Sequence, residues 1–332
     1  MRSRHAAAVS ACVLVVLGVL ALGWSWGPAG HTPPTPVTQP PVPLAHVAAS
    51  ASPTEGGATP VPAPPAPDAP RPGRLLAIGN SFATGAIAEY LSPLARAGGH
   101  DLSIGIAWIG GAPLDLHAAN AASGAGAYTY LHVDATGVRR DSSGISLDQA
   151  LTAEDWDVVT IQQASPLSGR PDALEPALST LVSHIRERLP GARILVHQTW
   201  AYAWGTGSSG FATYGRDQCR MYAELVETYD LAVSHVGDSG LVPTGTTLQV
   251  ARAHGVAEAD LTVGDGMHLK APHGQFLAAL TWYESLYGEP APPTFTPDGV
   301  TIPAARSLRE AAHAAVDWRD GVRFVVPCRE PA

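Results

Sequence analysis

The sequence has few charged residues for its length. Only 15% of its 332 residues are Asp, Glu, Lys or Arg, and acidic residues outnumber basic ones, which gives a formal net charge of −9 and a pI of about 5.8. The basic residues are scattered and form no cluster. Proteins that bind a nucleic-acid backbone usually carry a basic face, so a nucleic-acid partner is not expected.

Cysteine is also scarce, with three in the chain. Cys12 lies in an apolar run, so Cys219 and Cys328 are the only pair available for a disulfide in an oxidising compartment. The sequence leaves their pairing open, because it does not show whether their α-carbons come within bridging distance. The histidines His254 and His273 have no metal-ligand spacing with cysteine or acidic residues, and no metal site is expected.

Hydrophobic residues make up 45% of the chain, which suits one packed domain plus a tail. Residues 1–26 contain Arg2 and Arg4 followed by an apolar run over 6–24, a pattern typical of a signal peptide or a signal anchor. Either one predicts an exported, extracytoplasmic protein, secreted or held at the membrane by residues 6–24. Residues 27–73, rich in Pro, Ala and Thr, are expected to form a disordered linker.

From residue 74 to about 325, apolar runs alternate with helical patterns, which predicts an α/β fold. We expect a three-layer α/β/α sandwich with a flavodoxin-like parallel sheet. The expected strands are 75–79, 101–107, 157–162, 193–198 and 231–236, and the expected helices are 82–97, 171–189, 214–229, 270–286 and 303–318. Residues 126–149 are predicted to form a hairpin inserted beside the site, and 322–326 a docked strand.

A strand-to-helix junction at Ser81 organises the chain. The apolar run 75–78 stops at Gly79-Asn80-Ser81, and the apolar residues after it recur at helical spacing. A serine delivered to the carboxyl end of a parallel strand lies where catalytic groups gather in open α/β sheets. Serine is also a common helix N-cap, so this stretch alone does not assign a nucleophile.

A second motif lies far downstream, in the glycine-rich stretch Gly264-Asp265-Gly266-Met267-His268. It places an aspartate and a histidine three residues apart, just before another helical pattern. Together with Ser81, Asp265 and His268 complete the set of side chains needed for acyl transfer.

These motifs resemble the SGNH or GDSL-type hydrolases, whose first block is a Gly-Asp-Ser-like turn and whose last is Asp-x-x-His. The sequence looks most like a little-characterised bacterial branch that has Gly-Asn-Ser-Phe, Gly-Gly, a strand ending in Gln-Gln, and Asp-Gly-x-His. Those blocks stand here at 79–82, 110–111, 156–163 and 265–268. The resemblance covers roughly residues 74–290, and asparagine replaces the aspartate that many members have in the first block.

The resemblance also implies an oxyanion hole. In the family its donors are the amide of the nucleophile, a glycine amide from the second block and a side chain from the third, which is usually asparagine. Ser81 and Gly111 match the first two, although Gly111 is also explained by a tight turn. Gln162 and Gln163 stand at the third, and because successive strand side chains point to opposite faces, only one of them can serve. We predict Gln163, since it is nearer the carboxyl edge, and we expect Gln162 to line the site.

Other residues compete for these roles or surround them. Gly237-Asp238-Ser239 spells the first block better than Gly79-Asn80-Ser81 does, but the glycine and glutamine blocks would then precede the nucleophile, which favours Ser81. We expect Trp108, His197 and Trp200, at the ends of strands, to contact substrate. Core packing is the alternative for the two tryptophans, and a buried, hydrogen-bonded imidazole is the alternative for His197.

The sequence therefore predicts a serine ester hydrolase that removes O-acyl groups, acetyl among them, from an acylated small molecule or polysaccharide and needs no cofactor. Two alternatives stay open at this point. One is an O-acyltransferase that uses the same triad on a glycan, and the other is a catalytically silent glycan-binding domain.

Overall fold

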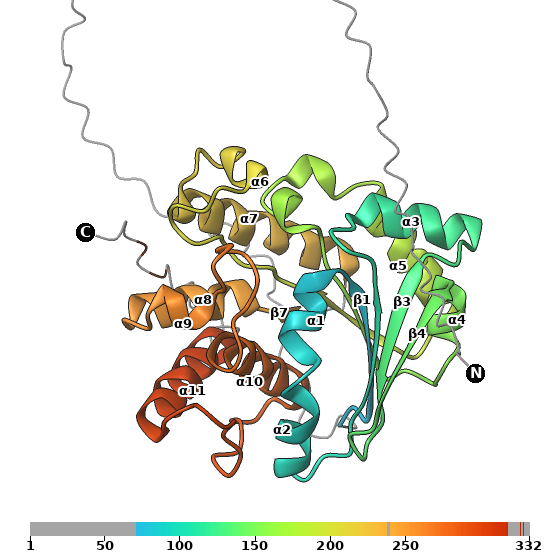
Figure 1. Cartoon of the computed structure of the whole chain (residues 1–332). Helices are drawn as coiled ribbons and strands as arrows, with labels where there is room; N and C mark the ends of the chain where they lie inside the picture. The colour runs from blue at the N-terminus through green and yellow to red at the C-terminus, as the bar shows by residue number, and fades with distance from the viewer. Residues whose placement is uncertain (1–70, 238–239, 318–325, 327, 329–332) are drawn as a thin grey trace, which may run out of the picture. The chain divides into compact units, whose positions relative to one another are not determined.

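A seven-stranded sheet forms the middle layer of the protein (Figure 1). The computed structural model describes residues 71–237, 240–317, 326 and 328. In the sheet order β4-β3-β2-β1-β5-β6-β7, five strands form a continuous parallel sheet and the other two form an antiparallel hairpin at one edge. The parallel strands are β1 (Arg74–Gly79), β2 (Ser103–Trp108), β5 (Val158–Ile161), β6 (Arg193–His197) and β7 (Gly240–Val242), and the hairpin strands are β3 (Tyr128–Val133) and β4 (Arg139–Ile145).

The order of the parallel strands is that of flavodoxin-like folds. Chain order runs outward from β1 to β2 on one side and through β5, β6 and β7 on the other, so it reverses between β1 and β5. Ligands of such sheets bind outside the carboxyl ends of the strands at this reversal. The predicted fold class is confirmed, and the residue after β1 lies at the position where a site is expected.

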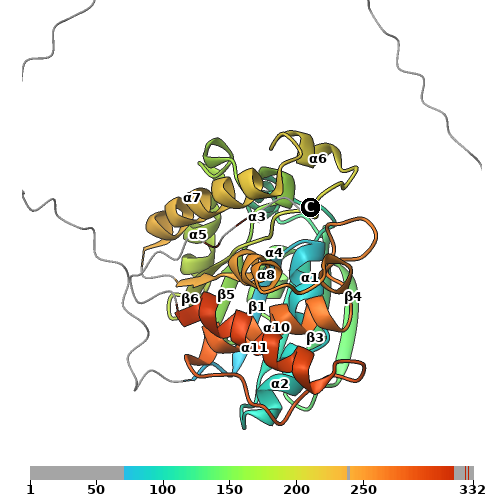
Figure 2. The ribbon, with the colours of Figure 1, turned by 90° about the vertical axis from the view of Figure 1, so that its left-hand side faces the viewer.

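Helices cover both faces of the sheet (Figures 1 and 2). They pack into two groups, consistent with a three-layer sandwich. One face carries α1 (Ser81–Ile87), α2 (Leu91–Ala97), α8 (Thr244–Ala253), α10 (His273–Tyr287) and α11 (Ile302–Asp317); the other carries α3 (Leu114–Ser123), α4 (Leu147–Leu151), α5 (Ala177–Arg188) and α7 (Gln218–Val236). The shorter elements are α6 (Ser209–Ala212), α9 (Glu258–Leu261) and 3-10 turns at Ser165–Leu167 and Pro171–Ala173.

The predicted hairpin is present and extends the sheet beyond β2. Its turn is held by the Asp134 carboxylate, which accepts hydrogen bonds from the amides of Thr136 and Val138, each at 3.0 Å. Thr129 pairs with Trp108, so the hairpin begins beside the carboxyl end of β2. The predicted strands at 75–79, 101–107, 157–162 and 193–198 and the predicted final helix are also confirmed, with ends within about two residues.

The strand predicted at 231–236 is wrong, because these residues form the last turns of α7. Their apolar residues look like a short strand when read alone. Within α7, however, Leu225, Tyr229, Ala232 and Val236 are buried at intervals of four, three and four residues, which is the period of a helix. The fifth parallel strand is the shorter β7 instead.

Two predicted helices are shortened or divided at prolines. The helix expected over 82–97 is two helices, since Pro93 has no N–H to donate to the preceding turn and is tolerated only in the first turn of α2. In the same way, α5 begins only after Pro176, and a 3-10 turn precedes it.

Several predictions fall outside the described residues. They concern the signal segment 1–26, the linker 27–73 up to residue 70, and nearly all of the strand at 322–326. A search of the described part of the chain finds no helix that could cross a membrane.

Cys219 and Cys328 form a disulfide, with α-carbons 5.3 Å apart. It links α7 to a residue beyond α11 and closes a loop with a sequence separation of 109. Pairing, which the sequence left open, is settled because the fold brings the two α-carbons within bridging distance.

Cys219→Ser should lower the free energy of unfolding by about 2–5 kcal/mol, because a long loop is no longer closed in the unfolded chain. Urea unfolding followed by circular dichroism measures the change. As a control, a thiol reductant should lower the unfolding midpoint of the wild type but not that of the variant. Equal midpoints for the two oxidised proteins would contradict a stabilising role.

Candidate active site

Ser81 is the first residue of α1, and only Asn80 separates it from the end of β1. Its neighbour Asn80, in an extended conformation, is the N-cap: the Asn80 Oδ1 accepts a hydrogen bond from Phe82 N at 3.0 Å. Because Asn80 does the capping, the hydroxyl of Ser81 is left for another partner. The N-cap alternative raised by the sequence therefore applies to Asn80 and not to Ser81.

That partner is His268, on the loop between α9 and α10, which Figure 1 shows in orange beside α1. Ser81 Oγ lies 2.9 Å from His268 Nε2, and His268 Nδ1 lies 2.6 Å from Asp265 Oδ2. The carboxylate only accepts, so Nδ1 carries the hydrogen and Nε2 is free to accept from the serine hydroxyl. Ser81 and His268, 187 residues apart in the sequence, thus form one hydrogen-bonded chain with Asp265.

Backbone amides fix the carboxylate of Asp265 in its loop. The second oxygen, Oδ1, accepts from Met267 N at 2.8 Å and from His268 N at 3.0 Å. Burial favours the neutral acid, but the hydrogen bonds from the His268 side chain and from these two amides outweigh it and lower the pKa of Asp265. Asp265 therefore stays ionised at neutral pH and can hold His268 in one orientation.

Two contacts from the segment after β6 hold the 264–268 loop. Trp200 Nε1 donates to the carbonyl of Met267 at 2.7 Å, and Ala203 N donates to the carbonyl of Gly266 at 2.8 Å. The Trp200 ring also stacks on Phe82, with centroids 4.1 Å apart. Trp200 thus connects the helix that carries Ser81 to the loop that carries His268.

The Gly110-Gly111 turn lies against the turn that carries Ser81. Ile109 N donates to Gly79 O at 3.1 Å, and Asn80 Nδ2 donates to Ala112 O at 3.1 Å. Gly111 has a φ of +64°, which glycine adopts without strain. Within the described part of the chain, no hydrogen bond uses the amide of Ser81 or of Gly111, so both remain able to donate to a ligand.

Gln163 is not placed as predicted. Its Oε1 accepts from Leu114 N at 3.0 Å and from Ala164 N at 2.8 Å, and its Nε2 donates to Ala173 O at 2.8 Å. These bonds hold the amide against the start of α3 and the turn before α5, where it joins two loops. A side chain so fixed is a loop anchor, and the oxyanion role predicted for Gln163 does not fit this arrangement.

Gln162 is the glutamine that faces the Ser81 turn. Its Nε2 donates to Asn80 Oδ1 at 2.7 Å, and a Cβ at Gly79 would come within 2.8 Å of its side chain. Glycine at position 79 is therefore required by this close approach. Gln162 is 2% exposed, so it supports the Ser81 turn from the buried side. The prediction that Gln162 lines the site and contacts substrate does not fit this burial.

His197 continues the same hydrogen-bonded chain one strand further. It is 1% exposed, its Nδ1 lies 3.0 Å from Gln162 Oε1, and its Nε2 lies 3.1 Å from Thr244 Oγ1. Burial lowers the pKa of His197 to about 3, so the ring is neutral at physiological pH. Because the amide oxygen can only accept, Nδ1 donates to Gln162 and Nε2 accepts from the Thr244 hydroxyl.

Trp200 and His197, two of the residues expected to contact substrate, are buried and instead support the site. Trp200 is 0% exposed and His197 is 1% exposed, so neither has surface available for a substrate, which corrects both predictions. Only Trp108, at the end of β2, is partly exposed. The sequence analysis missed Asn80 as a functional residue, although its place before Ser81 and the N-cap preference for asparagine could have indicated it.

The predicted rival Ser239 lies outside the described residues. No group of three or more His, Cys, Asp or Glu side chains that could hold a metal ion occurs among the residues that are described.

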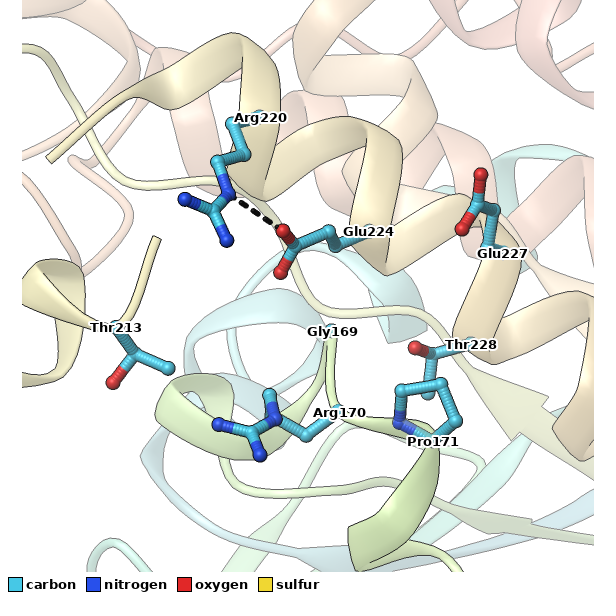
Figure 3. Close-up of a pocket in the computed structure, with 8 residues that line it drawn as sticks. All are labelled: Gly169, Arg170, Pro171, Thr213, Arg220, Glu224, Glu227 and Thr228. Carbon is cyan, nitrogen blue, oxygen red and sulfur yellow. Dashed lines mark hydrogen bonds and ion pairs between the residues drawn. The ribbon is translucent and has the colours of Figure 1, made fainter. Parts of the chain in front are cut away.

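A cavity of about 290 Å³ lies away from Ser81, between the turn at 169–171 and α7 (Figure 3). Its two arginines pair with carboxylates nearby: Arg220 with Glu224 at 2.7 Å, and Arg170 with Asp172 at 3.0 Å. None of its lining residues belongs to the Ser81, His268 and Asp265 chain. We assign it no part in the chemistry.

Residues 74–315 match the model of the family described as Domain of unknown function (DUF4886). The chain belongs to this family. The crystal structure of a DUF4886 family protein from Bacteroides uniformis is 36% identical to it, covers 76% of this chain and 97% of that chain, and has a TM-score of 0.71. A search of curated protein sequences gives no match.

More distant structures are similar as well. A protein of Slackia heliotrinireducens described as a candidate SGNH hydrolase is 23% identical, with 64% of this chain and 97% of that chain covered and a TM-score of 0.45. The acetylxylan esterase Axe2 of Geobacillus stearothermophilus is 13% identical, with 64% and 94% covered and a TM-score of 0.40. The DUF4886 match, and not these likenesses, fixes the family of the chain.

Gln163→Ala should lower the free energy of unfolding by about 2 kcal/mol or more, because it leaves buried amides of Leu114 and Ala164 and the carbonyl of Ala173 without partners. Urea unfolding measures the loss. Gln275→Ala is the matched control, since within the described residues the Oε1 of Gln275 has no hydrogen-bond partner. Unchanged stability with a hundredfold lower turnover would instead restore Gln163 as an oxyanion donor.

Proposed function

We propose that this DUF4886 protein is a serine ester hydrolase. One observation carries the proposal: the chain of hydrogen bonds from Ser81 Oγ through His268 to Asp265, at 2.9 and 2.6 Å. A nucleophile bonded to a base that is itself oriented by a carboxylate is the arrangement that activates serine in acyl transfer.

The reaction follows from these contacts. Ser81 Oγ attacks the ester carbonyl while His268 Nε2 takes its proton, and the carbonyl oxygen becomes negatively charged. The free amides of Ser81 and Gly111 receive that charge as hydrogen-bond donors. His268 then returns the proton to the leaving alcohol, and water, activated by the same imidazole, releases the acid and restores Ser81.

The substrate we propose is an O-acylated carbohydrate outside the cytoplasm, with acetyl as the acyl group. A native disulfide is typical of proteins in oxidising compartments. Residues 1–26 have the pattern of an export signal or anchor, and 27–73 that of a spacer. Acylated polysaccharide is an ester found in such a place, and a partly exposed site suits a polymer.

Ser81→Ala should abolish hydrolysis of an aryl acetate while leaving the unfolding midpoint unchanged, because only the attacking oxygen is lost. Release of the aryl alcohol measures the rate. Ser239→Ala is the matched control, since it removes the serine of the second Gly-Asp-Ser sequence, and it should retain full activity. The opposite result would transfer the nucleophile to Ser239.

Hydrolysis should slow at acidic pH, because only a neutral His268 can accept the proton of Ser81. Burial favours the neutral acid, but hydrogen bonds from His268 and from the amides of Met267 and His268 lower the pKa of Asp265, so it stays a carboxylate in mild acid and its own protonation does not cause this loss. The turnover rate at saturating substrate, measured against pH, tests this. A flat profile with chemistry rate-limiting would remove His268 from the role of base.

A further inference from the structure

Two of the described tryptophans lie at the carboxyl edge of the sheet with part of their rings exposed. Trp156, Trp200 and Trp282 are 3%, 0% and 0% exposed and belong to the core. Trp108 and Trp204 are partly exposed; Trp108 ends β2, and Trp204 follows β6, so they lie on opposite sides of β1 in the sheet order. A partly exposed tryptophan beside a site offers a ligand an apolar ring face.

Trp204 lines a groove of about 500 Å³ that borders the catalytic loop. Gly264 and Gly266, which flank Asp265, form part of its wall, together with the exposed Val263. Thr206, on the same groove, donates its hydroxyl to the carbonyl of Asp265 at 2.5 Å. The volume is within the range of small-molecule sites, and the groove is continuous with the loop that carries His268.

The chemistry of the reaction decides which part of an ester lies on this side. His268 must reach the leaving oxygen to protonate it, so the alcohol part of the substrate lies next to the loop that carries His268. The carbonyl oxygen of the ester points toward the oxyanion donors of Ser81 and Gly111, away from this loop. A groove bordered by residues 263–266 is therefore placed to hold the alcohol part.

The groove has both apolar and hydrogen-bonding walls. Trp204 and Val263 offer apolar surface, while Glu258 and Lys270 offer charged groups already fixed in place. Glu258 pairs with Arg252 at 2.9 Å, and Lys270 Nζ donates to the carbonyl of Ala259 at 2.5 Å. An ammonium has three donors, so within the described part of the chain Lys270 keeps two for a ligand.

We propose that this groove is a carbohydrate subsite, in which a pyranose ring on the alcohol side of the ester packs its C–H face on Trp204 and directs its hydroxyls to Lys270 and Glu258. This assignment rests on the proposed ester hydrolase function and adds the part of the substrate that the groove binds. An alkyl chain would gain nothing from the two charged groups, whereas a sugar uses both kinds of wall.

The test compares Trp204→Ala with the wild type on an O-acetylated pyranose oligosaccharide and on methyl acetate. The variant should raise the KM for the oligosaccharide about tenfold with kcat unchanged, since the lost stacking affects ground state and transition state alike. Hydrolysis of methyl acetate, whose alcohol part is a single carbon and does not reach Trp204, should not change. Leu231→Ala, another exposed apolar residue that lines neither this groove nor the cavity of Figure 3, is the control and should match the wild type on both.

Two further measurements separate the possible failures. Val263→Arg places a long side chain in the groove from an exposed position and should raise the oligosaccharide KM even if Trp204→Ala does not fold. Calorimetric titration of the deacetylated oligosaccharide into the Ser81→Ala variant should show binding. The same titration into a variant that carries both Ser81→Ala and Trp204→Ala should show none. Binding without any hydrolysis by the wild type would overturn the hydrolase and keep the subsite.

If Trp204→Ala lowered the hydrolysis of both substrates equally, Trp204 would act only by positioning the 264–268 loop. That result would overturn the subsite. So would a groove variant that alters the preference for acyl chain length and leaves the oligosaccharide KM unchanged.

Discussion

A single chain of buried hydrogen bonds runs along the carboxyl edge of the sheet, and the geometry at Ser81 depends on it. It passes from Ala112, after β2, to Asn80 after β1, to Gln162 after β5, to His197 at the end of β6 and to Thr244 after β7. This is the order of the strands in the sheet. Each bond joins neighbouring strands just below the surface on which the candidate nucleophile stands.

The chain also explains why asparagine, and not aspartate, precedes Ser81. Asn80 must donate to the carbonyl of Ala112 and accept from Phe82 N and from Gln162 Nε2 at the same time. An amide can do both, whereas a carboxylate accepts only. Asn80 is also 2% exposed, and its hydrogen-bond partners within the described residues are uncharged, so an ionised side chain buried there would lose its hydration without a counter-charge.

The sequence predicted most strands of the sheet, because they are apolar runs bounded by glycine or polar residues. The Ser81 and Asp265–His268 motifs could be recognised because each lies within a few consecutive residues. The sequence was less informative about side chains whose role depends on their neighbours in the folded structure. Alternation correctly places Gln162 and Gln163 on opposite faces. Which of these faces carries Asn80 and His197 is set by tertiary packing, and the glutamine that bonds to Asn80 is Gln162, whereas Gln163 bonds to Leu114. Residues 231–236 follow a helical period that becomes evident only when α7 is taken as a whole.

The Ser81 turn of the site is buried and rigid, whereas the loop that carries His268 and Asp265 is open to solvent. Ser81 stands on a turn fixed by buried amides, where there is no room even for a Cβ at Gly79. The side chains of His268 and Asp265 are 43% and 38% exposed, on a loop fixed through Trp200 on the core side and Thr206 on the groove side. An exposed imidazole leaves a path for a bulky alcohol to depart and for water to enter. A charge pair so open to solvent gains little from attraction alone, so its orientation depends on the amides of Met267 and His268 that hold Asp265.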